Sequence, residues 1–177
     1  MRNYVLLLIL FLSIFSCTDC EDDAIIEVNQ EDIDLVTGLD ILQDEFSEVI
    51  RLGNPNILQG QSIVFPNPAV NYLNIKTNNS LNLSSVWIVD GYQRKIYQDI
   101  NFDTTLNSNL YSEDFLNANA NARLDFLDNS SSNLQINLEN LTEGYYRVFV
   151  KINDAIEWHN IYKGDITIQE LIDYWDN

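Results

Sequence analysis

The sequence offers few side chains for catalysis, and their spacing argues against an active site. His159 is its one histidine, so neither a zinc site nor a catalytic triad can be completed around it. We expect this residue at the surface or in an edge strand. Carboxylates are abundant, but no spacing singles out the opposed pair that two-carboxylate hydrolysis needs. A glycine-rich phosphate loop and a Gly-x-Ser-x-Gly motif are also absent from the sequence. The sequence therefore predicts no enzyme and no cofactor.

Cys17 is the residue whose setting indicates a chemical modification. It follows a basic residue and a long apolar run, the layout of a secretory signal peptide over residues 1–16. The run is shorter than the roughly 18 to 20 apolar residues that span a bilayer, which disfavours a transmembrane helix. Ile14-Phe15-Ser16-Cys17 resembles the lipobox of bacterial lipoproteins, in which the cysteine is acylated and becomes the mature N-terminus. An ordinary cleaved signal with an incidental cysteine is the alternative.

The residues that follow Cys17 are acidic. Cys17–Asp23 resembles the acidic stretch behind the lipidated cysteine of surface-exposed lipoproteins in the Bacteroidota, and a flexible spacer is the alternative. The resemblance implies an outer membrane lipoprotein on the periplasmic or cell-surface face, with the surface favoured. Cys20 has no partner for an intrachain disulfide once Cys17 is lipidated. Asp103-Thr104-Thr105 resembles the O-glycosylation motif of the same bacteria, which makes Thr104 a candidate acceptor.

The charge of the chain limits its partners. With 27 acidic and 9 basic side chains, the formal net charge is −18 at pH 7. This charge repels nucleic-acid phosphates and excludes nucleic-acid binding, and it leaves the lipid as the contact with the membrane. The acidic residues 19–23 lack the loop pattern that holds calcium, so no metal site is predicted. Hydrophobic residues make up 46% of the chain, enough for one folded domain with a tether.

The tether is predicted over residues 17–60 and contains one short amphipathic helix at Asp40–Ile50. Its apolar side chains would share one face: Leu42, Phe46, Val49 and Ile50. Gly53-Asn54-Pro55 would end this helix. We expect this N-terminal helix to pack on the main domain, and a partner-binding helix is the alternative.

Residues 61–163 show the pattern of a β-sheet domain. Short runs of β-branched and aromatic residues predict strands at Ser62–Phe65, Tyr72–Lys76, Ser85–Asp90, Arg94–Tyr97, Leu134–Leu138, Gly144–Ile152 and Ile156–Tyr162. Pro66-Asn67-Pro68 and Asp90-Gly91 are predicted turns. Residues 102–133, rich in Asn, Ser and Asp, are predicted to be a long, mostly irregular loop, with a strand or a turn of helix at Leu124–Leu127 as the alternative. The pattern favours an all-β fold in which two antiparallel sheets form a sandwich.

Motifs at both ends of this domain resemble one family. Val64–Pro68, Tyr72–Ile75 and Val86–Gly91 resemble the opening of the C-terminal sorting domain of type IX secretion cargo. Leu138–Val148 resembles its later half, where a leucine, a glycine and an aromatic residue introduce a long strand. The resemblance implies an immunoglobulin-like β-sandwich over about residues 64–163, recognised by the type IX export machinery. Here, however, only a short segment precedes the domain, and a lipidated cysteine is an export address of its own.

The chain also continues past the last predicted strand, unlike that family. Residues 164–177 are predicted to form a short C-terminal amphipathic helix. Thr167 and Glu170 have the spacing of a capping box. The apolar residues that follow would share one face: Ile168, Leu171, Ile172 and Trp175.

Three functions are compatible with these features. The first is a non-enzymatic envelope lipoprotein whose β-sandwich is an interaction or structural module for another envelope protein. The second is a protein whose domain is recognised by type IX secretion components. The third is a carbohydrate-binding module that would use exposed aromatics such as Trp87 and Trp158, although aromatic residues in strands are more often core.

Overall fold

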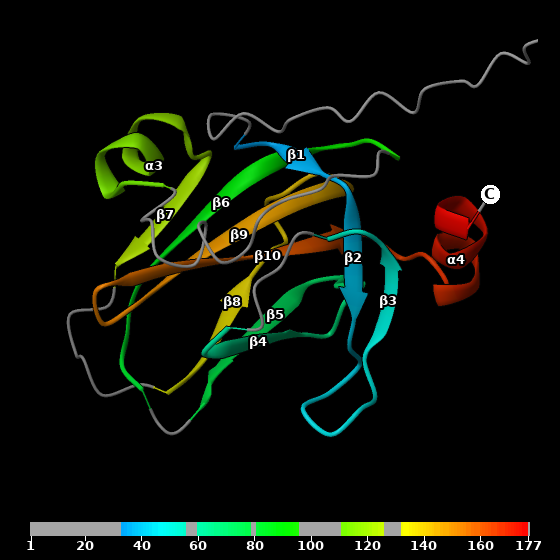
Figure 1. Cartoon of the computed structure of the whole chain (residues 1–177), viewed down its shortest axis with the longest axis horizontal. Coiled ribbons are helices and arrows are strands. Elements are labelled where there is room, and N and C mark those ends of the chain that lie inside the picture. The colour runs from blue at the N-terminus through cyan, green and yellow to red at the C-terminus, as the bar shows by residue number, and fades with distance from the viewer. Residues whose placement is uncertain (1–32, 56–59, 79–80, 96–110, 126–131, 177) are drawn as a thin grey trace, which may run out of the picture.

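The computed structural model describes residues 33–55, 60–78, 81–95, 111–125 and 132–176. These residues form strands in three sheets and two short helices, α3 and α4 (Figure 1). The all-β class that the strand pattern predicts is confirmed.

The smaller of the two main sheets has three antiparallel strands. They are β4 (Ser62–Phe65), β5 (Tyr72–Thr77) and β8 (Asn133–Asn137), with β5 in the centre. Val64 lies opposite Ile75, and Leu73 lies opposite Ile136. Because alternate side chains of a strand point to opposite faces, these four apolar residues line one face of the sheet, and all four are buried.

The larger sheet has five strands. Its main order is β1 (Leu35–Val36), β6 (Leu83–Gln93), β9 (Gly144–Ile152) and β10 (Ala155–Lys163), and β7 (Ala122–Asp125) also pairs with β6. β9 and β10 form a hairpin, and β1 is parallel to β6. The middles of β6, β9 and β10 are continuously buried, which is typical of strands covered on both faces.

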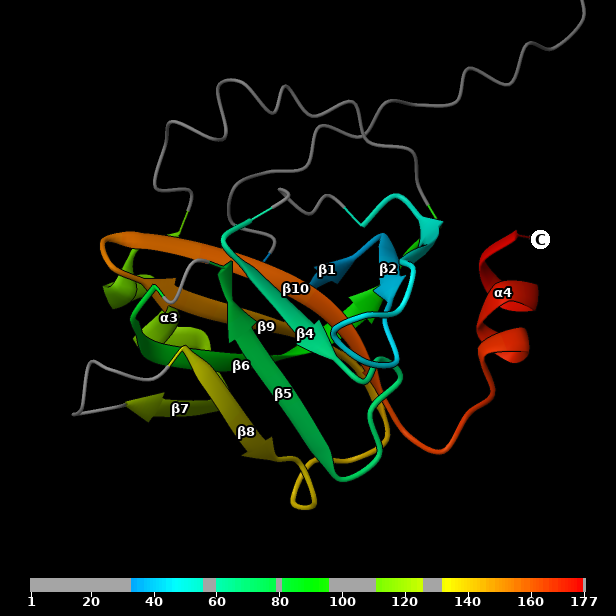
Figure 2. The ribbon, with the colours of Figure 1, turned by 90° about the horizontal axis from the view of Figure 1, so that it is seen from below.

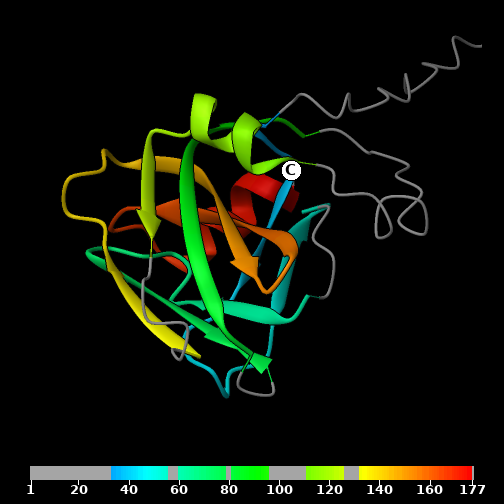
Figure 3. The ribbon, with the colours of Figure 1, turned by 90° about the vertical axis from the view of Figure 1, so that its left-hand side faces the viewer.

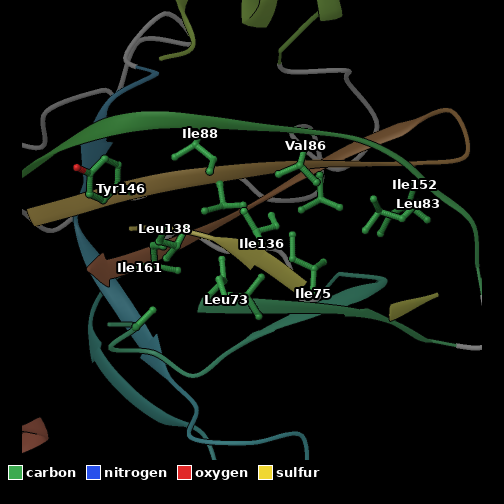
Figure 4. Packing of buried hydrophobic residues seen from close by; sticks show 14 residues of the cluster. Leu73, Ile75, Leu83, Val86, Ile88, Ile136, Leu138, Tyr146, Ile152 and Ile161 are labelled. Carbon is green, nitrogen blue, oxygen red and sulfur yellow. The ribbon is translucent and has the colours of Figure 1, made fainter. Parts of the chain in front are cut away.

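The main hydrophobic core lies between these two sheets. Figure 4 shows side chains from β5 and β8 pointing toward side chains from β6 and β9, and Figure 2 shows the two layers from below. The buried core residues are Val64, Ala69, Leu73, Ile75, Leu83, Val86, Ile88, Ile136, Leu138, Tyr146, Val148, Val150, Ile152 and Ile161.

The helix predicted at Asp40–Ile50 is wrong. The segment is a β-hairpin of β2 (Gly38–Ile41) and β3 (Ile50–Gly53) joined by a loop. Two alternating residues of β2, Leu39 and Ile41, are fully buried, whereas Phe46 is 88% exposed. The alternating burial of Leu39 and Ile41 fits a strand, whereas of the four apolar residues with helical spacing only Leu42 is buried.

The turn predicted at Asp90-Gly91 is also wrong, because β6 continues through it to Gln93. A Cβ atom on Gly91 would lie 2.8 Å from Val36 Cγ2 and 2.9 Å from the carbonyl carbon of Tyr145. Gly91 therefore allows β1 and β9 to approach β6 closely, and it does not reverse the chain. The predicted strand Arg94–Tyr97 lies partly outside the described residues, and Arg94 and Lys95 follow β6 without strand structure.

The outer face of the larger sheet is covered by a second apolar cluster. It joins Trp87, Phe149 and Trp158 of the sheet to Tyr111 and Leu116. α3 (Glu113–Asn119) contributes Leu116 and is N-capped by Ser112. Figure 3 shows this helix in yellow-green above the strands of the larger sheet. The prediction of a mostly irregular loop at 102–133 is therefore wrong for residues 113–119, which form α3. β7 (Ala122–Asp125) overlaps the short element predicted at Leu124–Leu127, whose last two residues lie outside the described residues.

α4 (Ile168–Asp176) lies within the segment 164–177, where the capping box predicts a helix. Glu170 N donates to Thr167 Oγ1, and Thr167 N donates to Glu170 Oε2. Two apolar side chains of α4, Leu171 and Trp175, are buried in a third cluster. The other buried members of this cluster come from β1, β2 and β3: Val36, Leu39, Ile41 and Leu52. Segments from both ends of the described chain therefore pack together.

Candidate functional site

A pocket of about 630 Å³ lies where the β2–β3 hairpin meets β4 and β10. Its volume is in the range of small-ligand and peptide pockets. β4 and β10 are edge strands of the two main sheets, so the pocket lies at an open side of the layered structure. Its described lining includes Asp40, Arg51, Val64, His159 and Asn160.

A chain of hydrogen bonds joins three buried polar residues at the pocket. Glu157 accepts a bond from Gln61 N at 2.6 Å and one from Ser62 Oγ at 3.0 Å. Ser62 Oγ also lies 2.9 Å from His159 Nε2. A hydroxyl has one proton, and here a carboxylate accepts it, so His159 Nε2 must be the donor to Ser62.

This proton arrangement is the reverse of the one that activates a serine nucleophile. In a catalytic triad the imidazole accepts the hydroxyl proton, and the carboxylate orients the imidazole from its far side. Here the carboxylate of Glu157 accepts the Ser62 proton directly, and the ring donates to Ser62. The three groups form a buried network that connects β4 to β10.

His159 is neutral at physiological pH. Burial lowers its pKa from 6.5 to about 4, although the nearby carboxylate of Asp40 acts in the opposite direction. With Nε2 as donor, Nδ1 of the neutral ring is left as an acceptor. The prediction for this residue is half right: it lies in an edge strand, but it is buried and not at the surface.

Asn67 holds the hairpin, the turn after β4 and β10 together. Its Nδ2 donates to the carbonyl oxygens of Asp40 and Asn160, at 2.7 and 3.1 Å. Its Oδ1 accepts from Tyr162 N at 3.0 Å. β2 and β10 form no strand ladder with each other. The fully buried amide of Asn67 instead supplies hydrogen bonds between them.

Asn160 is a second buried amide at the pocket. Its Nδ2 donates to the carbonyl oxygens of Gly38 and Pro55, both at 2.9 Å, which fixes the orientation of the side chain. Its Oδ1 is buried and accepts no hydrogen bond from the described residues. A buried acceptor without a donor is unfavourable, so this oxygen marks a place for one.

Asp40 and Arg51 form a paired charge at the rim of the pocket. Arg51 Nε and Nη2 donate to the two oxygens of Asp40, each at 2.8 Å. The two residues lie opposite each other on β2 and β3. This bidentate pair stiffens the hairpin and leaves little net charge at the rim.

A second pocket, of about 440 Å³, lies between α4 and the larger sheet. Tyr145, Tyr162 and Tyr174 line it together with Asp90 and Glu143. Tyr162 donates to Glu143 Oε1 at 3.0 Å, and burial raises the pKa of Tyr145 to about 12. Tyr162 is thus a donor to a carboxylate at this pocket, and Tyr145 keeps its proton.

Arg147 is a buried cation on the outer face of the larger sheet. Its guanidinium carbon lies 5.5, 5.2 and 5.5 Å from the ring centroids of Tyr111, Phe149 and Trp158. Its Nη1 donates to Ile33 O and to the Tyr111 hydroxyl. These contacts attach residue 33 and the α3 region to the sheet, which is a structural role.

Most sequence-predicted sites lie outside the described residues. Cys17, Cys20, the acidic residues 19–23 and Thr104 all belong to this group. Trp87 and Trp158, the candidates for sugar binding, are buried, so neither presents a ring to a sugar. The expectation that strand aromatics are core is confirmed for both.

The polar network at the first pocket was missed in the sequence. Glu157 and His159 are two residues apart on one strand, so their side chains share a face, and this signal was available. Ser62 is more than 90 residues away, and no spacing connects it to them.

The described part of the chain has neither a metal-binding cluster nor a membrane-spanning helix. It contains no group of three or more histidine, cysteine or acidic side chains placed to hold a metal ion. No helix within the described ranges is long and apolar enough to cross a membrane.

Comparison with known proteins gives little. No family profile and no curated protein sequence matches the chain. Among solved structures, the soluble domain of PmoD from Methylocystis sp. ATCC 49242 is similar with 9% sequence identity and a TM-score of 0.40. The similarity covers 61% of this chain and 96% of the PmoD domain.

Proposed function

We propose that this chain is a non-enzymatic envelope lipoprotein, held at the outer membrane by lipid on Cys17, on the periplasmic or cell-surface face. Its described part, which we interpret as an immunoglobulin-like β-sandwich, is an interaction module. The observation that favours this function is the pocket at the β2–β3 hairpin. In its hydrogen-bonded network Ser62 donates to Glu157, which does not suit a nucleophile. The buried Oδ1 of Asn160 in the same pocket is left as an acceptor for a partner.

The lipid anchor is tested by matched cysteine variants. We expect Cys17→Ser to move the protein from the membrane to the soluble fraction, because the anionic domain has no other attraction to lipid. The control variant Cys20→Ser makes the same sulfur-to-oxygen change three residues further on. This variant should stay in the membrane fraction. The measurement is fractionation of cells followed by immunoblotting. Equal membrane retention of both variants would refute the anchor.

The packing of α4 bears on the type IX alternative. A cleavable sorting domain would separate from the protein that it exports. Here Leu171 and Trp175 at the C-terminal end pack on Leu39 and Leu52 from the N-terminal hairpin. Because both ends share one core, we favour a retained module over a removable signal. Recognition by type IX components remains a second proposal, which depends on the motif resemblance.

The tyrosine pocket favours sugar binding as a third candidate. Tyrosine rings beside Asp90 and Glu143 are the residue types that stack on and hydrogen-bond to sugars. Screening the protein on a glycan array, with Tyr174→Ala as the comparison, tests this candidate. Loss of a glycan signal in that variant supports it, and the absence of any signal refutes it.

A further inference from the structure

The free edge of β4 faces the pocket at the hairpin. Asn78 N donates to Gln61 O, and the β4–β5 register continues from this pair. In an antiparallel ladder, hydrogen-bonded pairs alternate with pairs that turn their main-chain groups outward. The main-chain N–H and C=O groups of Ser62 and Val64 therefore point away from β5. Both residues line the pocket.

The outward-pointing main-chain groups of Ser62 and Val64 have little contact with bulk water. Ser62 and Val64 are only 3% and 6% exposed, and no main-chain hydrogen bond from the described residues reaches their free edge. Buried main-chain groups are nearly always paired, because leaving them unpaired is unfavourable. The buried Oδ1 of Asn160 lines the same pocket and also lacks a donor. The pocket thus presents donors and acceptors in the alternating pattern of a strand edge.

A polypeptide strand is the ligand that satisfies this pattern. Only another main chain offers N–H and C=O groups at the repeat of Ser62 and Val64. The wall beside them is apolar, with Leu42 and Val49 from the hairpin and Val49 itself 55% exposed. Among the described lining residues the charged side chains are Asp40 and Arg51, which pair with each other, and the whole chain has a net charge of −18. This balance favours a basic peptide over an acidic one.

We propose that the pocket binds an extended, basic segment of a partner protein, which pairs its main chain with the free edge of β4. This inference rests on the proposed interaction function and names the class of partner. It is independent of the lipid anchor, so failure of either one leaves the other standing.

The test uses the full mature lipidated chain in detergent micelles and a blocked peptide, Ac-Val-Lys-Val-Lys-Val-Lys-NH₂. We expect saturable binding with a dissociation constant below about 1 mM, and NMR shifts of the Ser62 and Val64 amide protons. Two further peptides have N-methyl groups on the odd or on the even residues. One set should abolish binding and the other should retain it, because only alternate amides face β4.

Matched variants of the protein locate the site. Val49→Lys adds a positive charge to the pocket wall, which repels the lysine peptide, and should weaken binding at least about tenfold. Val70→Lys makes the same change at a comparably exposed valine outside the described lining and should leave binding unchanged. The proposal is overturned if the lysine peptide does not bind, if both N-methylated peptides bind equally well, or if both variants respond alike.

Discussion

The direction of the hydrogen bond made by the Ser62 hydroxyl determines the chemistry of the pocket at the hairpin. Ser62 donates to Glu157, so the serine oxygen faces His159 as an acceptor. The ring remains neutral because burial lowers its pKa to about 4. A neutral ring that is already a donor cannot remove the serine proton. At the scale of single residues, this network therefore holds Ser62 in hydrogen bonds and does not activate it as a nucleophile.

The buried state of His159 predicts a loss of stability in mild acid. Its folded pKa of about 4 lies below the ordinary 6.5, so the unfolded chain binds the proton more readily. The stabilising contribution is complete above pH 6.5 and is lost as the pH falls toward 4. We expect the free energy of unfolding to decrease by up to about 3 kcal/mol from this group.

Urea denaturation between pH 7.5 and pH 4 measures this loss. His159→Gln keeps a side-chain donor for Ser62 but does not titrate, so its stability should change less with pH over this window. Carboxylates such as Asp125 and Glu170, whose pKa values are lowered by hydrogen bonds, act alike in both proteins and cancel in the difference. Parallel pH profiles for the two proteins would show that His159 is not buried in its neutral form.

At the scale of elements, α4 is part of the core and not an appendage. Leu171 is fully buried among residues of β1, β2 and β3. We expect Leu171→Ala to lower the free energy of unfolding by about 2–5 kcal/mol, as for other large-to-small changes in cores. Asp176→Ala, on the exposed side of the same helix, should change it by less than about 0.5 kcal/mol. Thermal denaturation measures both losses of stability. If the two variants lose the same amount, α4 is not packed on the hairpin.

Gly91 allows three strands to meet, and its substitution tests that packing. A methyl group at this position would lie within 2.9 Å of Val36 and of the Tyr145 main chain. Gly91→Ala should therefore destabilise the protein by about 1–3 kcal/mol through overpacking. The neighbouring side chain of Tyr92 is 61% exposed, so Tyr92→Ser serves as the control with little effect. If Gly91→Ala is as stable as the wild type in denaturant titration, β1 does not approach β6 this closely.

Strands with strong local signals could be predicted, and elements decided by distant contacts could not. Gly144–Ile152 lies in β9 because its β-branched and aromatic residues suit a doubly covered strand. The Asp40–Ile50 segment has helical spacing, yet Leu39 and Ile41 become core only after α4 packs on them. Asp90-Gly91 has the composition of a turn, but its glycine serves contacts with Val36 and Tyr145, which sequence spacing does not reveal. The pocket was missed for the same reason, since Ser62 meets His159 across the fold.

At the scale of the whole molecule, the N-terminal and C-terminal elements of the described chain pack together. The β2–β3 hairpin and α4 pack together with Val36 of the larger sheet. Figure 1 shows α4 on the side of β3. The net charge of −18 repels the phosphates of nucleic acids and of anionic lipids. We infer that lipid at one end supplies membrane attachment, while the pocket at the hairpin is left for a protein partner.

Mass spectrometry of the intact protein from its native membrane tests this proposal most directly. We predict an N-terminus at an acylated Cys17 and a C-terminus that still includes Trp175 and the residues after it. Such a mass would show an anchored protein with its C-terminal helix retained. A mature chain that starts without acyl groups, or that ends before Ile168, would contradict the anchored and uncleaved module.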